Sequence, residues 1–473
     1  MSRSKQHSNL QQQTALDLLT GLPPHLRRWL RWEHAFLLAL AISLWGPLLL
    51  HQTSIVALGL RTDFLGVYVG ARAVETGRGP QLYDLEVQSA LLDAAILPYH
   101  RGKLMPFIYP AYVAVLFRPL GALPFGTALR TWFLMNLATV LWTATRLSRL
   151  SVSSLSGRLA ILAIFAVWVP LQLTLFQGQL GILPALGILQ AIVAVRSGHD
   201  LRAGWWLSLG LIKPQLILFP LLVFMVWGRW RTVMAFFIAL AGALGISIGT
   251  IGFWVKSYVH FLMDYNRRGA ELSLYPAAMQ NWRGLACWLV KTDRGLAVWS
   301  VLLVLSVISI VTVLLICYRH SGDLDFEYSS SLQGEARYAT AVLLGLLSSP
   351  HLYMHDWVVA LPAGFILWSF ARESYSRGVS MKYRAEALLW LLGLAPVVFF
   401  GAQFVWSGPT VPLFVAVLVA VTIVTLGALA RSPQSNAETH TGRPPFVERP
   451  SSARMVENRC SLLCGSPHHI SSD

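Results

Sequence analysis

The sequence predicts an all-α fold, a polytopic membrane bundle with about 10–12 transmembrane or half-spanning helices. Of its 473 residues, 55% are hydrophobic and 12% are charged, whereas a soluble domain carries about 25% charged residues. Many of the 18 Trp and 14 Tyr residues stand at the ends of apolar runs, as in interfacial belts. The net charge of +15 lies mostly in short loops beside those runs, so it indicates orientation and not nucleic-acid binding.

Three parts are expected along the chain. Residues 1–33 form a basic arm, residues 34–430 form the membrane domain, and the Ser-, Pro- and Asn-rich residues 431–473 form a disordered tail. Arginines at the end of the arm precede a first span at 35–60, with no cleavage site, so we expect a retained signal anchor. We expect the protein to be a multi-pass protein of the cell (inner) membrane. The positive-inside rule places both of its termini in the cytoplasm.

The same rule separates the remaining loops. Basic loops fall inside, and four segments fall outside: the first outer loop at 61–105, the turn at 177–179, the second outer loop at 255–283, and residues 349–356. We therefore expect the functional site on the outer face. The predicted spans are 125–147, 160–176, 180–195, 233–254, 296–317, 339–347, 357–370, 387–400 and 411–429.

Two apolar runs depart from a simple span. The run at 107–120 is too short to cross a bilayer, which indicates a half-span or re-entrant piece. The run at 204–227 is interrupted by Lys213-Pro214, and a broken hairpin with Lys213 near its tip would keep both basic ends inside. Non-helical backbone at that depth is tolerated only inside protein or at a cavity.

The first outer loop is expected to hold two short helices. One begins after Asp63 and ends before Gly77, and the other spans 83–97. The second would place Val87, Leu91 and Ala95 on one face and lie along the membrane interface.

Asp63 is the candidate catalytic base. It is a lone carboxylate at the point where the chain leaves the first predicted span. A carboxylate on the outer face is suited to take a proton from a hydroxyl beside a lipid-bound donor. The alternative is that its side chain only caps the helix that begins at Phe64, and both interpretations can hold together.

Lys213 is a charge inside an apolar run. An unpartnered charge at the centre of a span costs about 2.5–3.5 kcal/mol on insertion scales. Either a phosphate or a carboxylate partner would offset that cost. The alternative is that the long side chain snorkels to the interface.

His351, His355 and Asp356 stand together after Pro350. Two histidines one helical turn apart are compatible with a metal site, although no third ligand stands at a fixed spacing. A phosphate contact, a general-acid role and plain helix capping are the other interpretations. In the tail, Cys460 and Cys464 with His468 and His469 form a weak zinc pattern.

Several polar residues are candidates for substrate binding. Gln177 and Gln179 flank a glycine and are suited to bond sugar hydroxyls, unless the segment is a simple turn. Tyr109-Pro110 is suited to shape a cavity. Arg283 follows Gln280-Asn281-Trp282 and is a second candidate for a lipid phosphate.

Taken in order, these motifs resemble one family. They are Asp63-Phe with Tyr68, Tyr83-Asp84, Tyr109-Pro110, Arg118-Pro-Leu120, Gln177-Gly-Gln179, Lys213-Pro-Gln215, Gln280-Asn-Trp-Arg-Gly284, Ser349-Pro350 and His355-Asp356. The chain resembles glycosyltransferase family 87, the DUF2029 group that includes polyprenyl-phosphate-mannose-dependent mannosyltransferases. The resemblance covers about residues 60–362, and it is the order of these short motifs that makes it specific.

The resemblance implies a GT-C fold and an inverting enzyme with its site on the outer face. Asp63 matches the first-loop acid that acts as base. His355 matches the histidine of the family's Ser-Pro-rich outer segment and is assigned as catalytic, whereas His351 has no clear counterpart. Donor-phosphate contacts are assigned to Lys213, Arg283 and His351. Sugar or acceptor contacts are assigned to Tyr68, Tyr109, Gln177, Gln179, Gln280, Asn281 and Asp356.

The implied partners are a polyprenyl-phosphate sugar donor, a glycan or glycolipid acceptor, and membrane lipids. Mannose is the sugar that the resemblance favours, and arabinose is the alternative. No metal and no cofactor are implied. The competing class is a transporter or flippase of lipid-linked sugars, because broken helices such as the one at Lys213-Pro214 also occur in transporters. Against that class, no inverted repeat is evident, and most polar residues gather on one face.

Overall fold

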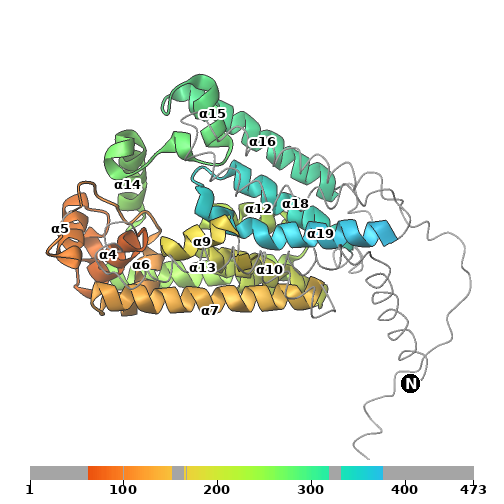
Figure 1. Ribbon diagram of the computed structural model, residues 1–473, viewed down its shortest axis with the longest axis horizontal. Coiled ribbons are helices and arrows are strands. Elements are labelled where there is room, and N and C mark those ends of the chain that lie inside the picture. Colours follow the sequence, from red (N-terminus) through yellow and green to blue (C-terminus); the bar gives the residue numbers. More distant parts are fainter. Residues whose placement is uncertain (1–61, 100, 152–164, 167, 319–331, 377–473) are drawn as a thin grey trace, which may run out of the picture. The chain divides into compact units, whose positions relative to one another are not determined.

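The computed structural model describes residues 62–99, 101–151, 165–166, 168–318 and 332–376 (Figure 1). Over these ranges the chain forms α-helices and short 3₁₀ helices, and no strand occurs among them, so the all-α class is confirmed. The predicted arm, first span, final pair of spans and tail all lie outside the described residues.

Membrane-spanning helices are present in the described part of the chain. By length and composition, α13 (Trp230–Ile251) and α16 (Leu296–Tyr318) are each able to cross a bilayer. A further candidate is a bent pair, in which α6 (Ala111–Gly121) meets α7 (Phe125–Ser151) at 112°. The predictions of spans near 233–254 and 296–317 agree with these helices, and so does the prediction that the run at 107–120 is short. The protein is therefore an all-α membrane protein.

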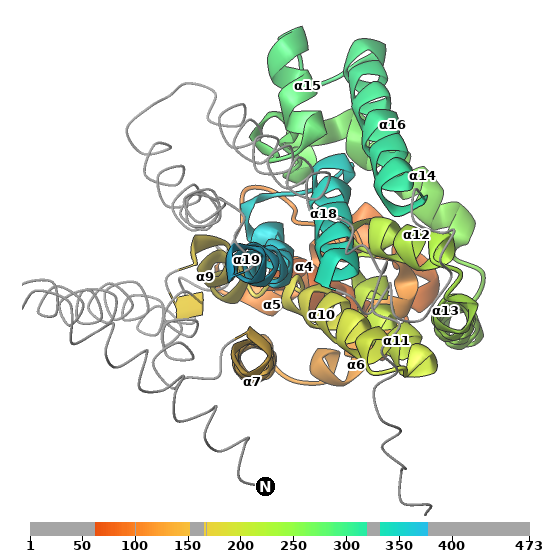
Figure 2. The same cartoon turned by 90° about the vertical axis from the view of Figure 1, so that its right-hand side faces the viewer.

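The centre of the bundle is formed by α10 (Ile182–Arg196), α18 (Leu332–Ser348) and α19 (Ala360–Ser376). Figure 2 shows α10 between α7 and α13, with α18 and α19 above it in that view. Almost every residue of α10 is buried, as expected for a helix that is apolar around its whole circumference. This core supports the shorter segments that carry polar side chains.

The break predicted at Lys213-Pro214 is confirmed. The chain runs through α11 (Asp200–Leu207) and two 3₁₀ helices (Ser208–Ile212 and Pro214–Leu216) into α12 (Leu218–Val226). Lys213 itself has φ −133° and ψ 74°. A residue before proline is pushed out of the α region, so the helix is interrupted there and the Lys213 backbone stands between two helical pieces.

The first outer loop folds into α4 (Phe64–Glu75) and α5 (Leu85–Ile96), close to the predicted bounds. The predicted apolar face of Val87, Leu91 and Ala95 is half-buried, and the fully buried positions of α5 lie one residue further along, at Gln88, Leu92 and Ile96. The reason is that the Gln88 carboxamide bonds two backbone groups: it donates to the Leu82 carbonyl (2.8 Å) and accepts from the Phe107 N–H (2.7 Å). A satisfied polar side chain can therefore occupy the buried face.

The second outer loop is more ordered than predicted. It contains α14 (Val255–Arg268), two 3₁₀ helices (Gly269–Leu272 and Pro276–Ala278) and α15 (Trp282–Val290). In α14 the buried residues are Phe261 and Tyr265, one turn apart, and the charged residues lie on the other faces. Two further short elements complete the site region: α9 (Val169–Phe176) and a 3₁₀ helix (Met354–Val359) that leads into α19.

Candidate active site

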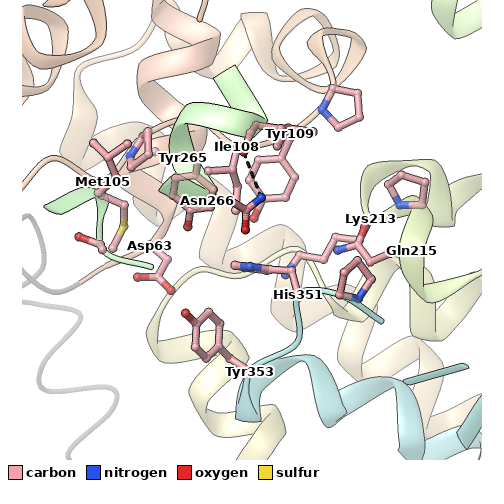
Figure 3. Close-up of a pocket in the computed structure, with 18 of the residues that line it drawn as sticks. Asp63, Met105, Ile108, Tyr109, Lys213, Gln215, Tyr265, Asn266, His351 and Tyr353 are labelled. Carbon is pink, nitrogen blue, oxygen red and sulfur yellow. Dashed lines mark hydrogen bonds between the residues drawn. The ribbon is translucent and has the colours of Figure 1, made fainter. Parts of the chain in front are cut away.

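Segments that are far apart in the sequence meet at a cavity of about 270 Å³. They are the start of α4, residues 105–110, the turn after α9, the break at Lys213, α14, α15 and the loop after α18. Figure 3 shows side chains from these segments pointing into one space. Of the residues predicted for the site, those that line the cavity are Asp63, Tyr109, Gln179, Lys213, Arg283, His351 and His355.

Asp63 is held at the cavity by the turn after α9. The Gln177 carbonyl accepts hydrogen bonds from the backbone N–H groups of Asp63 (2.9 Å) and Phe64 (3.0 Å). The Asp63 side chain makes no capping bond to α4, so the interpretation of this carboxylate as a side-chain cap is wrong. Its Oδ2 instead accepts a 2.6 Å hydrogen bond from Gln179 Nε2.

Gly178 makes this close approach possible. Its φ is +64°, and a Cβ atom there would lie 2.7 Å from the Phe64 Cβ. Positive φ is accessible to glycine at little cost. Trp132 Nε1 and Asn136 Nδ2 donate to the carbonyls of Gly178 (2.8 Å) and Gln179 (2.9 Å), so the turn is fixed from the α7 side as well.

Lys213 has the carboxylate partner that its burial requires. Its Nζ donates to Asp356 Oδ1 (2.6 Å) and to Gln179 Oε1 (2.9 Å). The residue is only 5% exposed, so the snorkelling alternative is wrong. An ammonium group has three N–H donors; two are engaged here, and Lys213 also lines the cavity.

Asp356 lies behind the cavity lining and does not itself line the cavity. It is fully buried, and its Oδ2 accepts from the Tyr353 N–H (3.3 Å) and lies 3.5 Å from His355 Nε2. The carbonyl of His355 accepts from Thr174 Oγ1 at 2.8 Å, which ties this segment to α9. One carboxylate thus contacts both Lys213 and His355.

Arg283, on α15, supplies a second cation to the cavity. Its guanidinium donates to Asn266 Oδ1 (3.0 Å) and to the Pro350 carbonyl (3.2 Å). It also lies 4.8 Å from the centre of the Trp299 ring, which is within range of a cation–π interaction. Arg283 is buried yet lines the cavity.

Five predicted contact residues support the cavity without lining it. The Tyr68 hydroxyl donates to the Leu123 carbonyl at 2.8 Å. Asn281 accepts from the Gly284 N–H (3.0 Å), which caps α15, and donates to the Ser349 carbonyl (2.6 Å). The other three are Gln177, Gln280 and Asp356.

The sequence prediction missed a group of aromatic and amide side chains in the cavity wall. They are Tyr258, Tyr265 and Asn266 from α14, Trp299 from α16, and Tyr353. Burial raises the pKa of Tyr353 to about 12. The apolar spacing of Phe261 and Tyr265 in the sequence was the available signal, because it indicates a helix face turned inward.

The histidines and acids of the described ranges do not form a metal-binding group of three or more His, Cys, Asp or Glu side chains. The tail residues Cys460 and Cys464 lie outside those ranges, as does an Asp-x-Asp pair at Asp323 and Asp325. Burial, followed by nearby cations, lowers the pKa of His351 to about 3, so this side chain is a neutral imidazole at physiological pH.

Comparison with known proteins identifies the family. A family model described as glycosyltransferase family 87 matches residues 107–350, just over half of the chain. The chain is 27% identical over 428 residues to the polyprenol-phosphate-mannose-dependent alpha-(1-2)-phosphatidylinositol pentamannoside mannosyltransferase of Mycolicibacterium smegmatis, covering 87% of this chain and 95% of the relative. It is 28% identical over 345 residues to the protein of the same name in Mycobacterium tuberculosis, covering 69% and 74% respectively.

No solved structure matches the chain significantly. The family match and the all-α membrane fold agree with the resemblance that the ordered motifs indicated. The chain belongs to glycosyltransferase family 87.

Proposed function

We propose that this enzyme transfers mannose from a polyprenyl-phosphate donor to a hydroxyl group of a membrane glycolipid, with inversion at the anomeric carbon. The names of both relatives support the donor, since each specifies polyprenol-phosphate-mannose. They also support the acceptor class, because each relative acts on a phosphatidylinositol mannoside. The alignment with the first relative covers 87% of this chain and 95% of the relative, and this coverage supports the proposal that the two proteins catalyse the same kind of reaction.

The observation that carries the proposal is that one carboxamide joins a carboxylate to a cation across the cavity. Gln179 donates to Asp63 and accepts from Lys213. Two hydrogen bonds and one carboxamide hold the Asp63 oxygen and the Lys213 nitrogen no more than about 8 Å apart. A base and a phosphate-binding cation within that distance can both reach oxygens attached to one anomeric carbon.

In the proposed reaction, Asp63 takes the proton of the acceptor hydroxyl. The acceptor oxygen attacks the anomeric carbon of mannose, and the bond from that carbon to the phosphate oxygen breaks with its electron pair on the phosphate. The products are the mannosylated acceptor, with inverted configuration, and polyprenyl phosphate. General-base assistance of this kind contributes about 10²–10⁴-fold to the rate.

The leaving phosphate needs positive charge on the other side of the sugar. Lys213 and Arg283 line the cavity as cations, and His355 is positioned by Asp356 as a hydrogen-bonding group. His351 is neutral and contributes an imidazole hydrogen bond. Donors that are already in place stabilise developing charge without reorganisation at the moment of reaction.

The outer face is the proposed location of this cavity, with both termini in the cytoplasm. The support is the distribution of basic loops, since the segments at 61–105, 177–179 and 349–356 lack a basic excess and all contribute to the cavity region.

The test is Asp63→Asn in membranes supplied with polyprenyl-phosphate mannose and a phosphatidylinositol mannoside. We expect product formation to fall by about 10²-fold or more, with expression and thermal unfolding close to those of the wild type. Asp84→Asn is the matched control, because Asp84 caps α5 away from the cavity and asparagine caps equally well. Near-normal transfer by Asp63→Asn would remove Asp63 from the role of base, and movement of the lipid-linked sugar without product would favour a flippase.

A further inference from the structure

Tyr265 places an unpartnered phenol hydroxyl in the cavity. The residue lies on α14, is only 7% exposed, and lines the cavity. Among the described residues its hydroxyl group has no hydrogen-bond partner, whereas the Tyr258 hydroxyl donates to the Ile108 carbonyl (3.2 Å) and the Tyr353 hydroxyl accepts from the Tyr275 N–H (2.9 Å). The hydroxyl oxygen is not one of the fully buried unpaired atoms of the described residues, so it is accessible from the cavity, and a substrate hydroxyl group can take the place of water there.

The Tyr265 ring is fixed in this orientation. It stacks on Phe261, with centroids 5.9 Å apart and planes at 15°, and lies 6.5 Å from the His351 ring. In Figure 3 its hydroxyl is turned towards the space beside the Asp63 carboxylate. Asp63 and Tyr353 both interact with it electrostatically. A group held in place before binding loses little entropy when a substrate arrives.

The phenol remains a donor over the working range of pH. Burial is the main cause that raises its pKa, and the neighbouring Tyr353, Tyr109 and Asp63 raise it further, while Arg283 lowers it. A neutral phenol donates one hydrogen bond and accepts others. The hydroxyl group of a pyranose can accept that hydrogen bond, whereas the Asp63 carboxylate beside it accepts a proton.

We propose that Tyr265 is a substrate-binding and specificity-determining residue, whose hydroxyl group donates a hydrogen bond to a pyranose hydroxyl oxygen held next to Asp63. The inference rests on the proposed function, because that function puts two sugars at this place. The pyranose belongs either to the donor or to the acceptor, and both offer the same chemistry. A site built to bond a substrate hydroxyl discriminates strongly against an analogue that lacks it.

The experiment uses the full-length protein in lipid nanodiscs and the variant Tyr265→Phe, which removes one oxygen atom and keeps the ring that stacks on Phe261. Steady-state constants are measured separately against polyprenyl-phosphate mannose and against a phosphatidylinositol mannoside. Monodeoxy analogues of each sugar are then compared. Tyr99→Phe is the matched control, since Tyr99 is 40% exposed and does not line the cavity.

We expect kcat/KM of Tyr265→Phe to fall by about 2- to 13-fold, which corresponds to one neutral hydrogen bond. With the wild-type enzyme, one monodeoxy analogue should show the same fold reduction in kcat/KM relative to the natural sugar. With Tyr265→Phe, that analogue and the natural sugar should give equal kcat/KM. That analogue identifies the hydroxyl group, and its identity as donor or acceptor identifies the source. Tyr265→Phe with wild-type kcat/KM for both substrates would overturn the proposal.

The proposed function and this inference fail in different ways. If the wild type makes no mannosylated product, the proposed function fails, and the binding of the phosphatidylinositol mannoside is measured by tryptophan fluorescence, because Trp299 lines the cavity. Weaker binding to Tyr265→Phe than to the wild type and to Tyr99→Phe then supports the role of Tyr265. Equal titration curves for all three proteins count against it.

Discussion

Gln179 Nε2 donates a 2.6 Å hydrogen bond to Asp63 Oδ2, while Oε1 of the same side chain accepts from Lys213 Nζ at 2.9 Å. The carboxamide is therefore oriented by both partners, with its donor side towards the carboxylate and its acceptor side towards the ammonium group. This arrangement assigns Gln179 a positioning role between two charged groups.

The first prediction concerns this positioning. Gln179→Met keeps the length of the side chain and removes both hydrogen bonds. Since hydrogen bonds to charged groups are worth about 1.5–3 kcal/mol, kcat should fall by about 10- to 150-fold, with KM for both substrates near the wild-type value. Gln81→Met, on an exposed surface, is the control. A raised KM with unchanged kcat would mean that Gln179 binds sugar directly.

A second prediction concerns the ion pair of Lys213 with Asp356. Both side chains are buried, and their atoms lie 2.6 Å apart. Asp356→Leu leaves an unpaired charge in the interior and should lower the free energy of unfolding by about 3–5 kcal/mol. The double variant Lys213→Met/Asp356→Leu should recover much of that stability while transfer stays low. Unfolding in detergent checks both, and a double variant less stable than the single one would contradict this account.

The third prediction separates steric fit from backbone strain at Gly178. Gly178→Ala and Gly77→Ala both place a Cβ at positive φ, +64° and +74°, which costs about 1–2 kcal/mol. Only at Gly178 would the Cβ meet Phe64, whereas nothing lies within 4 Å of it at Gly77. Gly178→Ala should therefore lose transfer activity, because the backbone of Asp63 is displaced, and Gly77→Ala should retain it. Equal activity in the two variants would argue against the role of this close approach.

The fourth prediction is a dependence of stability on pH. Burial lowers the pKa of His351 to about 3 in the folded protein, against about 6.5 in an unfolded chain. The unfolded state therefore binds the proton first, and stability present above pH 6.5 is lost as the pH falls towards 3, by up to about 1.4 kcal/mol per pH unit. Between pH 6.5 and 4, His351→Gln should lose stability less steeply than the wild type. Parallel unfolding curves for the two proteins would exclude this contribution.

The sequence was sufficient for the long apolar helices α13 and α16, for the two helices of the segment at 61–105, and for the parts of the site that local patterns mark. The lysine before Pro214 predicted a helix break, and the burial cost of its charge predicted a partner. The acid after the first apolar run was identified as a candidate base. These conclusions depend on composition and on neighbours within a few residues.

Contacts between distant segments were beyond the reach of such patterns. Nothing near Asp356 in the sequence indicates that its carboxylate serves Lys213, which lies 143 residues away. Asn281 was assigned to a sugar, but its side chain caps α15, because helix ends need partners for their N–H groups. Tyr265 was missed because the segment at 255–283 was interpreted as a loop, although its inward face carries Phe261 and Tyr265.

The separation of Lys213 and Asp356 also has a consequence for biosynthesis. Lys213 leaves the ribosome 143 residues ahead of its counter-ion, and a lysine at the centre of a span costs about 2.5–3.5 kcal/mol during insertion. We infer that the nascent chain carries this lysine without its final partner until the loop after α18 has been translated. The cavity is then completed late, and a polypeptide truncated before Ser349 would reach the membrane without the part of the cavity wall that Pro350, His351, Tyr353 and His355 form.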